Sequence, residues 1–352
     1  MRLTAKVRPF GRVELGKVAI IDIDRRASLR LGCSWAMEDP DQAEVEKYIK
    51  RHITLMNNAI EESKKLKFPS HREDPTNQQV VEICNNYGKS FIDREFPPNE
   101  MSIHGKITDG SESEAKASSP RKTASPRSSK KGKMINTYSQ IEWRRPSEFM
   151  TGAIKVFDNG ILAADIRQGF LGDCWFLSAI AALAEFPALV EALFPQDSRE
   201  YSKAGVYNVK FCKNGTWTLV RVDDYFPCFP SSGPIFSRSN GNELWVLLLE
   251  KAYAKLHGSY DLIKAGFCYE ALIDLTGAPC KSFRLDDSGE LWSELLRFDL
   301  ENYIMTASTP GEDESNVTGK RQKNSMGLVA GHSYTVISAK TTSKGDKILK
   351  LR

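Results

Sequence analysis

The chain has 352 residues and a formal net charge of +4 at pH 7, with 49 lysines and arginines against 45 aspartates and glutamates. This length predicts two or three compact units, and the nearly balanced charge gives no general case for nucleic-acid binding. The sequence has no N-terminal apolar leader and no apolar run approaching ~18 residues, which argues against secretion and against a transmembrane segment. Seven cysteines without paired spacing are typical of reduced thiols in a cytoplasmic protein, and no Cys/His cluster has zinc spacing.

Residues 1–87 are predicted to be an N-terminal extension to which we assign no chemistry. The run Lys17–Ile23 has the composition of a strand, and an ordinary strand is favoured over a metal or phosphotransfer site at Asp22 and Asp24, because no supporting motif follows. From Asp41 to Lys67, apolar residues recur at helical spacing with charge on the opposite face. This amphipathic helix could bind a regulatory partner, but packing on its own domain is the favoured interpretation.

Residues 106–137 are rich in Ser, Lys, Pro, Gly and Ala, a composition that predicts disorder. Between Ala117 and Lys133 there are six basic residues and no acid. The stretch could direct the protein to the nucleus, contact acidic partners or be phosphorylated at Ser119 and Ser125. A solvated linker with none of these roles is an equally good interpretation.

The stretch Gln168–Ala179 leads from glycines and polar residues directly into an apolar helix that begins at Cys174. Asp173 is a favourable N-cap residue, and Pro187 is expected to end the helix. At a helix N-terminus the backbone N–H groups and the helix dipole favour a thiolate, which is the nucleophilic form of cysteine. A side-chain N–H of Gln168 could face an oxyanion formed beside the sulfur. Taken alone, a small cysteine that merely packs is the more frequent case.

The segment after this helix predicts a hairpin and two further helices. Residues 206–211 and 217–222 alternate in polarity around Asn214–Gly215, which is a turn signal. Helices are predicted over 244–257 and 291–300.

The run Gly327–Ser338 reads as a strand that carries one histidine, His332, between two small residues. A histidine in open space can serve as a general base, although a lone histidine on an apolar strand is usually a packed core residue. A cysteine that opens a helix, followed much later by a histidine on a strand, is the chain order of papain-type cysteine proteases.

Both stretches resemble the protease core of the calpain family of cysteine proteases. The similarity covers roughly residues 88–105 and 138–352, so the basic stretch between them is interpreted as an insertion. The matching segments are Phe91–Pro97, Trp143–Pro146, Gln168–Phe176, Asp223–Pro227, Leu249–Lys255, Asp274–Gly277 and Gly331–Tyr334.

The resemblance implies an α+β, papain-like fold of two lobes. Residues 88–105 would open the domain, 138–280 would form the first lobe with the cysteine, and 281–352 would form part of the second lobe with the histidine. It implies an intracellular calcium-dependent endopeptidase that cuts protein substrates, with Cys174 as nucleophile, His332 as base and Gln168 at the oxyanion.

Five other positions receive roles from the resemblance alone. Gly331 and Gly277 match substrate-binding positions, although Ala278 replaces a second glycine of the family pattern. Calcium would be held by Asp165 and Glu243, with Gly160 adding a backbone carbonyl. Without the resemblance, both acids would be interpreted as ordinary surface residues.

The family's third catalytic residue is an asparagine after the strand that follows the histidine. In this sequence that strand is predicted at Lys347–Arg352, which places the asparagine just past Arg352. The 352 residues alone are therefore expected to be poorly active. The alternative is a catalytically inactive calpain-like protein that binds regulatory partners through its first lobe, its N-terminal extension or the basic linker.

Overall fold

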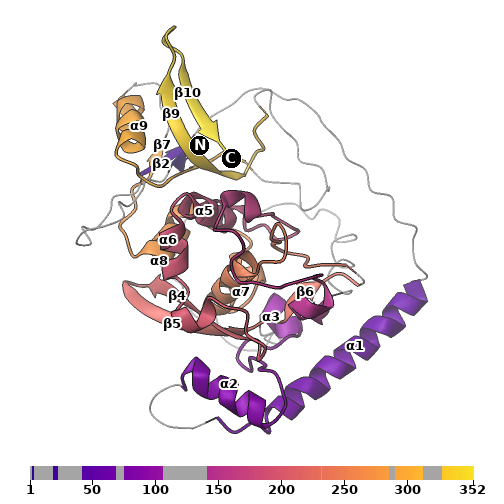
Figure 1. The fold of residues 1–352 in the computed structure, drawn as a ribbon. Coiled ribbons are helices and arrows are strands. Elements are labelled where there is room, and N and C mark those ends of the chain that lie inside the picture. The colour runs from indigo at the N-terminus through magenta and orange to yellow at the C-terminus, as the bar shows by residue number, and fades with distance from the viewer. Residues whose placement is uncertain are drawn as a thin grey trace, which may run out of the picture.

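The computed structural model describes residues 2–3, 19–22, 42–68, 75–105, 141–230, 232–284, 290–311 and 327–352. The predicted linker lies outside these residues, and so does Asp24. Within them the fold is mixed, with a helical body and a sheet beside it (Figure 1). Among the described residues, no helix has the length and apolar character needed to cross a bilayer.

The helical body contains the predicted first lobe. Its helices are α1 (Gln42–Ser63), α2 (Asn77–Asn86), α3 (Glu100–His104), α5 (Cys174–Ala184), α6 (Pro187–Ala192), α7 (Trp245–His257) and α8 (Cys268–Thr276). Its strands are β3 (Glu142–Arg144), which pairs with β6 (Phe226–Cys228), and β4 (Val206–Lys213), which pairs with β5 (Thr216–Asp223).

Helix α5 is buried between this body and the sheet, because it is apolar on every side and packs on both α8 and β9. Every residue from Trp175 to Ala184 is buried. Phe176 stacks flat on Tyr253 of α7, with ring centroids 4.2 Å apart, and so ties the two helices together. The predicted hairpin is confirmed, and its turn residues Asn214 and Gly215 have φ angles of +51° and +77°.

The sheet body has the strand order β10-β9-β8-β1-β7, and β2 also pairs with β8. The strand predicted in the N-terminal extension is confirmed as β2 and runs parallel to β8. Helix α9 packs against β9. The elements are β1 (Arg2–Leu3), β2 (Ala19–Asp22), β7 (Phe283–Arg284), α9 (Glu290–Leu300), β8 (Met305–Ser308), β9 (Ser333–Thr341) and β10 (Lys347–Leu351).

The strand predicted over Gly327–Ser338 begins later than expected. Strand β9 starts at Ser333, so His332 lies in the turn that precedes it and not within the strand. The reason is that Gly327 and Gly331 adopt φ angles of +81° and +62°, which interrupt an extended backbone.

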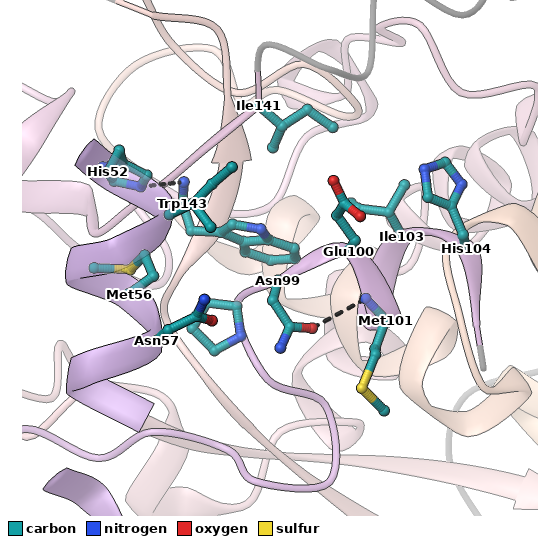
Figure 2. A pocket seen from close by; sticks show the side chains of 12 residues that line it. His52, Met56, Asn57, Asn99, Glu100, Met101, Ile103, His104, Ile141 and Trp143 are labelled. Carbon is teal, nitrogen blue, oxygen red and sulfur yellow. Dashed lines mark hydrogen bonds between the residues drawn. The ribbon is translucent and has the colours of Figure 1, made fainter. Parts of the chain in front are cut away.

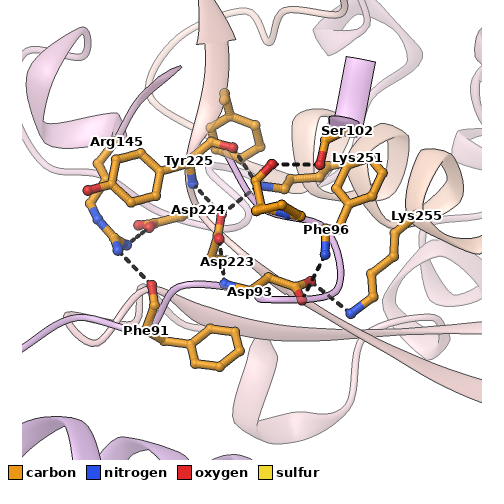
Figure 3. Close-up of polar contacts among 12 residues, drawn as sticks. Phe91, Asp93, Phe96, Ser102, Arg145, Asp223, Asp224, Tyr225, Lys251 and Lys255 are labelled. Carbon is orange, nitrogen blue, oxygen red and sulfur yellow. Dashed lines mark hydrogen bonds and ion pairs between the residues drawn. The ribbon is translucent and has the colours of Figure 1, made fainter. Parts of the chain in front are cut away.

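A buried polar network joins the segment around Phe91 to the rest of the helical body (Figure 3). Lys251 of α7 is fully buried and forms a 2.5 Å ion pair with Asp223. Asp223 also accepts a hydrogen bond from the backbone N–H of Asp93, at 2.7 Å. Two further ion pairs complete the network, Lys255 with Asp93 at 2.8 Å and Arg145 with Asp224. The network therefore holds the segment around Asp93 and the end of β5 against α7.

Candidate active site

Cys174 is a half-buried thiol at the first position of α5, where the sequence places it. The loop before it is held against residues 235–238, since Arg167 and Arg238 exchange backbone hydrogen bonds of 2.9 and 2.8 Å. Gly169 is required there, because a Cβ atom at this position would lie 1.8 Å from the carbonyl oxygen of Phe236. These contacts hold the loop in one conformation, and so they fix the position of Cys174 at the start of α5.

Gln168 lies half-buried in this loop. Its side-chain Nε2 donates a hydrogen bond to the carbonyl of Leu171, at 3.1 Å. This bond helps to orient the side-chain amide, whose nitrogen carries two N–H groups.

Asp173 occupies the N-cap position but does not act as a side-chain cap, contrary to the prediction. Both of its carboxyl oxygens are buried, and the side chain faces Glu250 of α7. Glu250 is also buried and accepts a hydrogen bond from the backbone N–H of Ser237, at 2.8 Å. Burial raises the pKa of Asp173 to about 7, and burial beside Asp173 raises the pKa of Glu250 well above its usual range. The pair therefore holds a proton near neutral pH, which weakens the opposition of Asp173 to a Cys174 thiolate.

We expect Asp173→Asn to reduce the pH dependence of protein stability. Between about pH 4 and pH 7 the native pair holds a proton that the unfolded chain releases. The free energy of unfolding therefore falls as pH rises through this window, by about 1.4 kcal/mol per pH unit for each such proton. Urea unfolding at pH 5, 6, 7 and 8 measures the slope. The exposed Glu191→Gln should leave the slope unchanged, and an unchanged slope in Asp173→Asn would contradict the proton-sharing pair.

His332 is 9% exposed and is held through its backbone. Its N–H donates to the hydroxyl of Thr309 at 3.0 Å, and its carbonyl accepts from the N–H of Thr309 at 2.9 Å. The imidazole packs edge-on against Tyr334, with ring centroids 5.0 Å apart.

The two lobes meet where α5 packs against β9 (Figure 1). The hydroxyl of Thr335 donates to the carbonyl of Ser178 at 2.9 Å, and this bond is buried. Ser178 lies one helical turn after Cys174, and Thr335 lies three residues after His332. One interface therefore carries both the helix that opens with the cysteine and the strand that follows the histidine.

Residues 91–352 match the sequence family described as calpain family cysteine protease. The chain belongs to this family. The calpain-type cysteine protease ADL1 of Oryza sativa subsp. japonica is 34% identical over 278 residues, which are 75% of this chain and 11% of that protein. The calpain-type cysteine protease DEK1 of Arabidopsis thaliana is 36% identical over the same shares of the two chains. Calpain-9 of Mus musculus is 35% identical over 195 residues, covering 55% of this chain and 28% of that protein. The calpain-type chain thus spans about a tenth of the length of its plant relatives.

The two acids expected to bind calcium lie next to each other in this calpain-type fold. Asp165 is 7% exposed and Glu243 is 1% exposed. Burial, and after it the adjacent Asp165 carboxylate, raises the pKa of Glu243 to about 7. The carboxylates are held by backbone donors, since the N–H of Leu162 bonds Asp165 at 2.7 Å and that of Asp158 bonds Glu243 at 3.3 Å. Gly160, with a φ angle of +102°, lies in the intervening loop.

The two glycines with predicted substrate roles both have left-handed backbones. Gly277 ends α8 at a φ angle of +67°, and a Cβ atom there would lie 3.3 Å from the sulfur of Cys212. Gly331 donates its N–H to the carbonyl of Pro310 at 3.1 Å. The left-handed backbone explains why glycine is favoured at each position. The contacts of these glycines with substrate stay predictions.

The antiparallel register of β9 and β10 changes where the expected asparagine would lie. Arg352 and Thr335 exchange two backbone hydrogen bonds of 3.0 Å, so Arg352 lies opposite Thr335. If the register continues without interruption, the position level with His332 would lie three residues after Arg352 and not directly after it.

Sequence reasoning missed three residues that shape the site. Thr309 holds the backbone of His332, and Glu250 faces Asp173. Gly266 lies against the indole of Trp175, where a Cβ atom would approach within 2.6 Å, and Trp175 donates to the carbonyl of Ile263 at 2.9 Å. Two of these residues could have been found from the sequence: Glu250 is a lone acid in an apolar helix, and Gly266 is a lone glycine just before a helix. Nothing in the sequence around Thr309 indicated its role.

A hollow of about 310 Å³ lies away from these residues, between α1, α3 and β3 (Figure 2). Met56, Met101 and Trp143 line it. The imidazole of His52 on α1 accepts a hydrogen bond from the backbone N–H of Trp143, at 3.0 Å. Helix α1 therefore packs on β3 of the first lobe, within the same chain.

Proposed function

We propose that this chain carries the protease core of a calcium-dependent cysteine endopeptidase that acts on proteins inside the cell. The packing of α5 on β9 is the observation that supports it most strongly. That interface joins the helix that begins at Cys174, in the first lobe, to the strand that follows His332, in the second, and Gln168 lies in the loop before the cysteine.

In the proposed reaction, His332 takes the thiol proton of Cys174, and the resulting thiolate attacks the carbonyl carbon of a peptide bond. The side-chain N–H of Gln168 and the backbone N–H of Cys174 stabilise the negative oxygen of the tetrahedral intermediate. His332 then protonates the leaving amine as the carbon–nitrogen bond breaks. Water, deprotonated by His332, hydrolyses the thioester and returns the free acid and the thiol.

Asp165 and Glu243 would hold calcium, together with backbone carbonyls near Gly160. Two adjacent buried carboxylates, of which Asp165 raises the pKa of Glu243, are a suitable donor set for a divalent cation with oxygen ligands. The cation would neutralise the pair and join the loop before Asp165 to the start of α7. Its proposed role is to stabilise the first lobe and not to take part in bond cleavage.

We expect Glu243→Gln to abolish the thermal stabilisation of the protein by calcium. In the wild-type chain, calcium at 100 times its Kd should add about 2.7 kcal/mol to the free energy of unfolding. The apparent calcium affinity should fall as pH drops below 7, because Glu243 must lose its proton to bind the ion. Thermal unfolding with calcium or magnesium measures both effects. The exposed Glu200→Gln is the control, and equal stabilisation of Glu243→Gln would exclude this site.

A labelled peptide that carries a thiol-reactive group tests the proposed function. The proposal expects calcium-dependent labelling of Cys174 that an unlabelled peptide suppresses. If Cys174 is not labelled in either condition, the alternative of an inactive calpain-like protein that binds regulatory partners is favoured instead.

A further inference from the structure

Behind Cys174 and His332, the interface between the lobes is built from small polar side chains. The first contact is the buried hydrogen bond from the Thr335 hydroxyl to the carbonyl of Ser178, at 2.9 Å. The backbone of Thr335 is already engaged within the sheet, since it lies opposite Thr306 of β8 and pairs with Arg352. Its hydroxyl is thus the group that reaches across to α5.

A second connection links the same two elements through α8 and β8. The hydroxyl of Ser178 lies 3.6 Å from the sulfur of Cys268, the first residue of α8. That sulfur lies 3.8 Å from the hydroxyl of Ser308, at the end of β8. Ser308 in turn lies 2.9 Å from the hydroxyl of Ser333, the residue next to His332. Together with the Thr335 bond, these contacts form a closed ring through both lobes.

The ring starts and ends close to the reactive residues. Ser178 is on the second turn of the helix that Cys174 opens, and Ser333 is the direct neighbour of His332. Ser178, Cys268 and Thr335 are 7%, 4% and 2% exposed, so water does not compete strongly for these contacts. An apolar interface could slide without losing a directed contact, whereas hydrogen bonds fix one register.

We propose that Thr335 and the chain Ser178–Cys268–Ser308–Ser333 are positioning residues that hold the Cys174 helix and the His332 turn in the register needed for proton transfer. This inference rests on the proposed function. The contacts differ in strength, because hydroxyl and carbonyl partners at 2.9 Å bond well and thiols bond weakly. Thr335 should therefore matter most, and Cys268 least.

The test compares Thr335→Val, Thr335→Ser and the wild-type chain by alkylation of Cys174 with iodoacetamide from pH 5 to pH 8. Thr335→Val keeps the side-chain shape and removes the donor. We expect its alkylation rate at pH 6 to fall about tenfold, because a misplaced histidine no longer stabilises the thiolate. Thr335→Ser should restore most of the rate. With a peptide substrate, kcat should fall by a similar factor while KM changes little.

Two controls and a second test variant make the result specific. Cys174→Ala gives the background from the other cysteines. Thr341→Val is the same change on the same strand, at a hydroxyl that accepts a bond from Trp292 and does not contact α5. It should leave alkylation unchanged. Ser308→Ala removes the 2.9 Å contact at the other end of the chain and provides a second variant if Thr335→Val does not fold.

Alkylation of Thr335→Val with the wild-type rate and pH profile would overturn the inference, and so would a Thr335→Ser variant as slow as Thr335→Val. The proposed function fails separately. If wild-type Cys174 reacts rapidly at pH 6 but no peptide is cleaved, the endopeptidase proposal is wrong, while the comparison of alkylation rates still decides the positioning role.

Discussion

Cys174→Ala is expected to abolish peptide cleavage and covalent labelling while the chain still folds. Losing the nucleophile removes the acyl-transfer route itself, so any turnover that the 352 residues show should fall to the uncatalysed background. Alanine is a strong helix former, and the sulfur is only half-buried, so α5 should keep its structure.

Peptide hydrolysis with calcium present measures the loss, and thermal unfolding checks the fold. Cys280→Ala is the matched control, since it also removes a partly buried thiol and burial raises the pKa of Cys280. It should keep full labelling and turnover. Retention of labelling by Cys174→Ala would show that another cysteine reacts with the probe, and retention of turnover would exclude Cys174 as the nucleophile.

Lys251→Met is expected to be the most destabilising single change outside the site. The Lys251 ammonium is fully buried, and it bonds both the Asp223 carboxylate and the carbonyl of Tyr225 at 2.5 Å (Figure 3). Methionine replaces the unbranched stem of lysine, one atom shorter, but leaves the Asp223 charge buried without its cation. Breaking such a buried pair costs about 3–5 kcal/mol, which is a large part of the stability of a typical domain.

Urea unfolding of Lys251→Met, Asp223→Asn and the double variant measures this coupling. The double variant should recover part of the loss, because the uncompensated charge is gone. Lys64→Met breaks an exposed pair with Glu61 and should cost less than about 1 kcal/mol. If Lys251→Met is as mild as Lys64→Met, the buried network does not hold the lobe together.

The sequence by itself determined the elements whose signals are local. An alanine-rich apolar run bounded by Asp173 and Pro187 predicts the helix that begins at Cys174, because helix propensity and proline act within a few residues. Asn214–Gly215 predicts its hairpin for the same reason, since these residues tolerate positive φ angles. The family resemblance, now confirmed, rested on motifs of this kind.

Only the tertiary structure decided how these elements are used. Asp173 looked like a helix cap, but the fold buries it against Glu250, on a helix far along the chain. Lys251 and Asp223 were recognised as family segments, yet nothing in their own neighbourhoods showed that they pair. Such choices depend on which faces meet when distant segments pack, and the free energy of burying a charge is set by the partner it meets there. The same reason placed Thr335 beside Ser178.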